Sequence, residues 1–123
     1  MSHYPEYIAF KESLQQIQDT IDLAKNQSYN DTGLNQTALF AGLEQVQQLF
    51  KEQILTMNWD RVPSDRVSSM QSYVTEMHKQ MRLLATDAIF FQTARQPATQ
   101  QQRLSQITTR IETLIRYCDA LLE

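Results

Sequence analysis

The stretch "VSSMQSYVTEMHKQMRLLATDAIFF", Val67 to Phe91, places apolar side chains at alternating steps of three and four residues. Its apolar positions are Val67, Met70, Val74, Met77, Met81, Leu84, Ala88 and Phe91. Such an unbroken alternation puts one apolar stripe along an α-helix and is typical of a helix packed along its whole length. We therefore expect a helix from about Ser64 to Gln92. At ~1.5 Å per residue it is ~40 Å long, which makes it the longest element of the chain.

Two segments before this stretch repeat the pattern. The first runs from about Tyr4 to Lys25, with Pro5 in its first turn, where a helix tolerates proline. Its stripe consists of Tyr7, Phe10, Leu14, Ile17, Ile21 and Ala24. The second runs from about Gln36 to Met57, with Asn35 as a suitable N-cap. Its stripe consists of Leu39, Leu43, Val46, Phe50 and Ile54.

One segment after the stretch completes the set. It runs from about Pro97 or Thr99 to Leu122, and Thr99 with Gln102 matches the Thr-x-x-Gln form of a capping box. Its stripe consists of Leu104, Ile107, Ile111, Leu114, Cys118 and Leu121. No segment shows the strict alternation of a half-buried β-strand.

The connections between these segments predict the fold. "NQSYNDTGLNQ", residues 26–36, reads as a loop; "NWDRVPSD" joins the second and third helices, and "TARQPAT" is the turn between the third and fourth. Short connections favour antiparallel neighbours, so we expect an all-α, antiparallel four-helix bundle-like arrangement with a long third helix. Residues 1–123 form a single helical domain in this prediction. The third helix outreaches the first two by about two turns. The excess either packs along the fourth helix or meets a partner.

Composition narrows the classes of function. The net charge of −3 disfavours nucleic acid as a partner, because phosphate binding usually needs a basic excess. The single cysteine, Cys118, allows no internal disulfide and fits a reducing compartment. The first ten residues show neither a basic segment nor an apolar one, and no apolar run approaches the ~20 residues of a membrane span. We expect a cytoplasmic protein without membrane insertion.

The residues offer no catalytic or metal-binding pattern. A di-iron bundle needs Glu-x-x-His on two helices, whereas here Glu76 is followed by His78, the wrong spacing for one helix face. Cys118 lies on the apolar stripe near a helix C-terminus, where a free cysteine usually packs in the core. Nucleotide, hydrolase and zinc-protease motifs are lacking. We expect no enzyme, no cofactor and no metal site.

A binding surface is the more specific hypothesis. Phe90 and Phe91 precede a turn flanked by arginines, and aromatic residues with arginine are typical of interface hot spots. The candidate partner-binding residues are Arg82, Phe90, Phe91, Arg95 and Arg103. The alternative is that the basic residues belong to a solvated helix face. The methionine stripe likewise has two interpretations, core filling or an adaptable binding groove. Residues 1–60 carry a net charge of −5 and residues 61–123 a net charge of +2, which suits an acidic protein partner.

"MQSYVTEMHKQMRLLATDAIFFQTARQPATQQQR", followed by "LIRYCDALL", resembles PatD, the small cyanobacterial protein family that controls heterocyst frequency. The most specific pieces are "HKQMRLL", "QTARQPAT" and "RYCDALL". The resemblance covers roughly Ser69 to Leu122, and the first half of the chain matches only in length and helical character.

The resemblance implies a non-enzymatic regulator of cell division and differentiation in filamentous cyanobacteria. The action attributed to the family is binding the tubulin-like division protein FtsZ and modulating its polymerisation. A homodimeric helical adaptor or structural protein, without direct FtsZ contact, is the alternative. A DNA-binding regulator would suit the biology, but the chain has no helix-turn-helix with a basic recognition helix.

Overall fold

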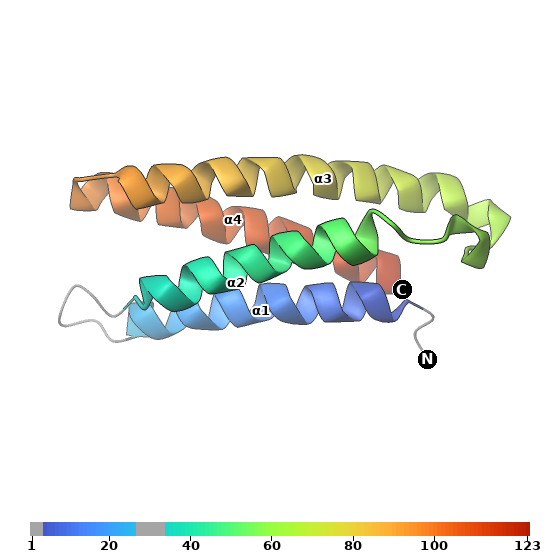
Figure 1. The fold of residues 1–123 in the computed structure, drawn as a ribbon, viewed down its shortest axis with the longest axis horizontal. Coiled ribbons are helices and arrows are strands. Elements are labelled where there is room, and N and C mark those ends of the chain that lie inside the picture. Colours follow the sequence, from blue (N-terminus) through green and yellow to red (C-terminus); the bar gives the residue numbers. More distant parts are fainter. Residues whose placement is uncertain (1–3, 27–33) are drawn as a thin grey trace.

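Four helices make up the computed structural model, which describes residues 4–26 and 34–123 (Figure 1). They are α1 (Pro5–Asn26), α2 (Gln36–Leu49), α3 (Ser64–Thr93) and α4 (Pro97–Leu122). A π-helical turn, Phe50–Ile54, continues α2, and a short 3-10 helix, Trp59–Arg61, precedes α3. No strand occurs within the described ranges. The predicted all-α class is confirmed.

The helices alternate in direction along the bundle (Figure 1). α3 lies against α4 over much of its length, and α1 packs against both α2 and α4. The C-terminal part of α3 packs along α4, whereas its first turns, yellow-green in Figure 1, extend past the C-terminal end of α4. By contrast α2 and α3, although consecutive in the chain, make few contacts with each other.

The core consists largely of the four predicted stripes. Their central members are buried: Tyr7, Phe10, Leu14, Ile17, Ile21, Leu39, Leu43, Val46, Phe50, Ile54, Met70, Met77, Met81, Leu84, Phe91, Ile107, Ile111, Leu114, Cys118 and Leu121. Three and four residue steps bring these side chains to one face of each helix, and burying that face is what holds four helices together. The methionines fill the core, as the first interpretation of their stripe predicted.

Helix starts follow the local sequence with one exception. The side-chain Oδ1 of Asn35 accepts the Ala38 N–H at 3.0 Å, which confirms Asn35 as the N-cap of α2. The predicted capping box at Thr99 is wrong, because α4 begins at Pro97 with Gln96 as its N-cap. Proline is pre-organised for the first helical position, so the helix starts there and Thr99 lies inside its first turn. The predicted loop at residues 26–36 lies mostly outside the described residues.

The second helix changes geometry before its predicted end at Met57. Its α-helical part ends at Leu49, and the Leu55 N–H then donates to the Phe50 carbonyl at 2.9 Å, five residues back. Val46, Phe50 and Ile54 follow one another in two steps of four. In an α-helix each such step drifts by about 40° around the axis. The wider π turn offsets this drift and keeps both Phe50 and Ile54 buried.

Gly42 lets α1 and α2 approach closely. A Cβ added at Gly42 would lie 2.9 Å from Cγ1 of the buried Ile17. We expect Gly42→Leu to lower the free energy of unfolding by about 1–3 kcal/mol through overpacking, despite the better helix propensity of leucine. Urea denaturation measures this. The matched control is Ala41→Leu, because Ala41 is exposed, and equal stability of the two variants would contradict the close approach.

Candidate functional site

The turn between α3 and α4 is a short, well-anchored corner. The Ala94 N–H donates to the Phe90 carbonyl at 3.0 Å, which closes the last turn of α3. The Gln100 side-chain Nε2 donates to the Ala94 carbonyl at 3.0 Å and ties α4 back to the turn. Only residues 94–96 separate the two helices. Side chains at the ends of both helices are therefore held in fixed relative positions.

Phe90 and Arg103 meet across this corner. The Arg103 guanidinium lies over the Phe90 ring, 4.7 Å from its centroid, a cation–π contact between α3 and α4. Phe90 remains 46% exposed and its neighbour Ile89 is 60% exposed. Arg95, in the turn itself, is also exposed. We call Phe90, Arg95 and Arg103 the corner surface.

Phe91 does not belong to the corner surface. It is 4% exposed and packs against Phe40 of α2, with 6.2 Å between ring centroids. The physical reason is its position on the apolar stripe, seven residues after Leu84, which directs it into the core while Phe90 points outward. The expectation that the two phenylalanines form one exposed pair is therefore corrected.

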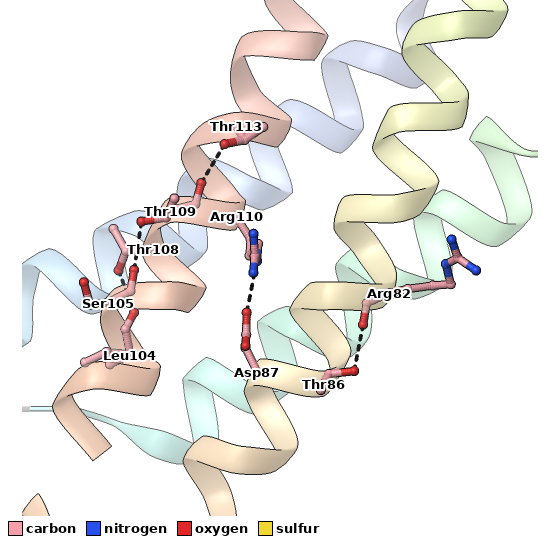
Figure 2. A network of polar contacts seen from close by, with 9 residues as sticks. All are labelled: Arg82, Thr86, Asp87, Leu104, Ser105, Thr108, Thr109, Arg110 and Thr113. Carbon is pink, nitrogen blue, oxygen red and sulfur yellow. Dashed lines mark hydrogen bonds and ion pairs between the residues drawn. The ribbon is translucent and has the colours of Figure 1, made fainter. Parts of the chain in front are cut away.

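Arg82 lies on a different flank of α3. Figure 2 shows its side chain pointing away from α4, whereas Asp87 points toward α4. Arg82 lines a groove of about 200 Å³ between α2 and α3, together with Gln47, Phe50, Lys51, Leu55, His78, Met81 and Ala85. The structure thus separates Arg82 from the corner surface. We did not predict this groove from the sequence. Its only indication was the methionine stripe, for which an adaptable binding groove was the second interpretation.

The corner surface is cationic. Residues 88–111 contain three arginines, Arg95, Arg103 and Arg110, and no Asp or Glu. Arg110 is engaged by Asp87, so the charge of the corner comes from the exposed Arg95 and the half-buried Arg103. A cationic rim beside an exposed aromatic ring suits an acidic protein surface, for which it provides electrostatic steering and orientation.

An ion pair joins α3 to α4 just behind the corner (Figure 2). Arg110 Nε donates to Asp87 Oδ2 at 3.1 Å, and Asp87 is only 6% exposed. A buried carboxylate needs such a partner, because desolvating an unpaired charge is costly. Sequence reasoning missed this pair. Its one signal was a lone acid, Asp87, inside an otherwise apolar stretch.

Hydroxyl groups near the pair are satisfied within their own helices. Figure 2 shows the side chains of Thr108, Thr109 and Thr113 bonded to carbonyl oxygens one turn earlier on α4. Thr86 bonds the Arg82 carbonyl in the same way on α3. These threonines therefore need no partner from outside.

Two ionisable groups of the core, Tyr7 and Cys118, are held in their neutral forms. Burial, reinforced by the charge of Asp119, raises the pKa of the Cys118 thiol to about 12. Burial, with smaller effects of Glu6 and Cys118, raises the pKa of Tyr7 to about 12, and its hydroxyl donates to the Met57 sulfur at 3.2 Å. A thiol kept protonated at neutral pH is a poor nucleophile.

The described residues were compared with two further kinds of feature, a metal-binding cluster and a membrane-spanning helix. No group of three or more His, Cys, Asp or Glu side chains in this part of the chain is arranged to hold a metal ion. Among the described helices, none has the length and apolar character needed to cross a membrane.

Comparison of the chain with protein-family models, with curated proteins and with solved structures finds no match in any of the three.

Proposed function

We propose that this protein is a non-enzymatic cytoplasmic regulator that binds FtsZ through the corner surface and modulates its polymerisation. In this proposal it acts in filamentous cyanobacteria, in the control of heterocyst frequency. The observation that carries the proposal is the exposed Phe90 ring with Arg103 stacked on it, next to a turn that carries the exposed Arg95. The PatD-like segments "QTARQPAT" and "HKQMRLL" lie at and before this same corner.

The chemistry of the corner supports a protein partner. FtsZ proteins are generally acidic, so an arginine rim without local carboxylates is complementary to them. Phe90 offers an apolar anchor of the kind that dominates interface energies, since aromatic residues and arginine are enriched at hot spots. The anchored turn keeps these groups in place before binding, which reduces the entropy lost on association.

Charge reversal at the corner tests the proposal. We expect Arg95→Glu with Arg103→Glu to weaken FtsZ binding by about tenfold or more at low salt, because attraction becomes repulsion. The difference in FtsZ affinity between this variant and the unmodified protein should shrink at high salt, since exposed charges are screened. Fluorescence anisotropy with labelled protein measures the affinity, and circular dichroism confirms folding.

The matched control for this variant is Lys51→Glu with Arg82→Glu. This control makes the same change in net charge at the groove between α2 and α3, which Lys51 and Arg82 both line. We expect it to bind FtsZ nearly as the unmodified protein does. Loss of binding in the control but not in the corner variant would contradict the proposed site.

A homodimeric adaptor is the second candidate. The adjacent exposed side chains Ile89 and Phe90 favour it, because exposed apolar pairs also drive self-association. Light scattering during size-exclusion chromatography measures the mass. A dimer that dissociates when Phe90 is changed to Glu would support this candidate over the first.

A further inference from the structure

The groove between α2 and α3 forms a second surface, distinct from the corner. Its floor is apolar, built from Phe50, Met81 and Ala85, and the exposed Leu55 stands at its edge. Phe50 and His78 contact each other across it, with ring centroids 5.8 Å apart. The helical repeat extends the α3 wall to the exposed Ile89, four residues after Ala85.

The groove arises from the backbone. α2 and α3 make few contacts with each other, so their facing sides are left partly uncovered. The π turn at Phe50–Ile54 lies at this wall, and Leu55, whose N–H donates to the Phe50 carbonyl five residues back, is 44% exposed. π turns inside helices frequently occur at functional sites.

The charged residues that line the groove are all basic. Lys51 and Arg82 lie among its lining residues, and none of the eight lining residues is acidic. Within the described chain, neither the Lys51 ammonium nor the Arg82 guanidinium forms an ion pair. Two cations beside an apolar floor are complementary to carboxylates that flank an apolar side chain.

The size and shape of the groove select the kind of occupant. About 200 Å³ is below the ~300–1,000 Å³ that small-molecule sites usually offer, but it accommodates one or two apolar side chains of a partner. A trough between two antiparallel helices fits a third helix, and the described residues offer no sheet edge to which a strand could be added. Two copies meeting groove to groove would bring like charges together, which disfavours that symmetric dimer.

We propose that the α2–α3 groove binds an acidic amphipathic helix of another protein. Apolar side chains one and two turns apart enter between Phe50, Met81 and Ala85. Carboxylates on the flanks of that helix pair with Lys51 and Arg82. The inference concerns the opposite flank of α3 from the corner surface, and it holds whether or not FtsZ is the partner of the corner.

A displayed peptide library tests the inference with the full-length chain. The probes are helix-forming peptides of about 18 residues with leucine at the i, i+3, i+4 and i+7 positions and random polar residues elsewhere. We expect selection on the unmodified protein to enrich acidic peptides. Synthetic copies should bind Lys51→Glu with Arg82→Glu about tenfold more weakly, and Arg95→Glu with Arg103→Glu nearly unchanged.

Backbone amide chemical shifts locate the selected peptide. The inference predicts that the shifts move at Gln47, Leu55 and Ala85. The proposal is overturned if no peptide is enriched, if enriched peptides show no acidic bias, or if the shifts move at Phe90 and Arg103 instead. A dimer of the free protein that Lys51→Glu with Arg82→Glu dissociates would also overturn it, in favour of a second copy as the occupant.

Discussion

Phe91→Ala is expected to lower the free energy of unfolding by about 3–5 kcal/mol, because it removes a buried aromatic ring and leaves a cavity. The ring is 4% exposed and packs against Phe40, one of the few places where α3 touches α2. This is a large fraction of the ~5–15 kcal/mol that typically separates folded from unfolded states. Urea denaturation followed by circular dichroism measures the change.

The neighbouring substitution is the control. Phe90→Ala removes a ring that is 46% exposed, so we expect a loss of only about 1 kcal/mol, composed of partial burial and the contact with Arg103. The two residues are adjacent in sequence but lie about 100° apart around the helix. Equal losses of stability would contradict the burial that separates these phenylalanines.

Arg110→Met is expected to lower the free energy of unfolding by about 2–3 kcal/mol, because it leaves the Asp87 carboxylate buried without its partner. The figure is below that for a fully buried pair, since the Arg110 side chain is 24% exposed and water partly screens the charge. Thermal or urea denaturation at neutral pH measures the loss.

A double-mutant cycle separates the contribution of the ion pair to the free energy of unfolding from that of side-chain packing. Asp87→Leu with Arg110→Met replaces both charges by apolar groups, and such replacements are often neutral or stabilising. We expect the double variant to recover most of the stability that Arg110→Met alone loses. A double variant as unstable as the sum of the two single variants would show that the ion pair does not couple α3 to α4.

The helices and the core could be predicted because they depend on local periodicity. The steps of three and four residues identify which side chains face inward on each of the four helices, and Asn35 marks the start of α2 through its own hydrogen bond. Pro97 marked the start of α4 equally well. It outweighs Thr99 because proline at the first helical position is already in helical geometry.

The π turn could not be read from the sequence. Two successive steps of four residues, Val46 to Phe50 to Ile54, drift by about 80° around an α-helix, which still fits within an ordinary apolar stripe. The position of Phe91 was readable, because it belongs to the apolar stripe, and that membership should have outweighed its place next to Phe90.

The groove and the Asp87–Arg110 pair depend on how the helices pack. The groove exists because α2 and α3 make few contacts with each other, and no single helix pattern contains that information. The pair joins residues 23 positions apart, so it depends on the register of α3 against α4. Arg82 was grouped with the corner by its charge and its closeness in sequence, because the periodicity of α3 does not tell which neighbouring helix each flank faces.

Assembly of FtsZ with GTP, followed by light scattering and sedimentation with and without the purified protein, tests our proposal that this protein acts on FtsZ. We expect the polymer signal to change and the protein to sediment with the polymers. An unchanged signal, with folded protein left in the supernatant of active FtsZ, would contradict direct modulation and leave the homodimeric adaptor as the leading candidate.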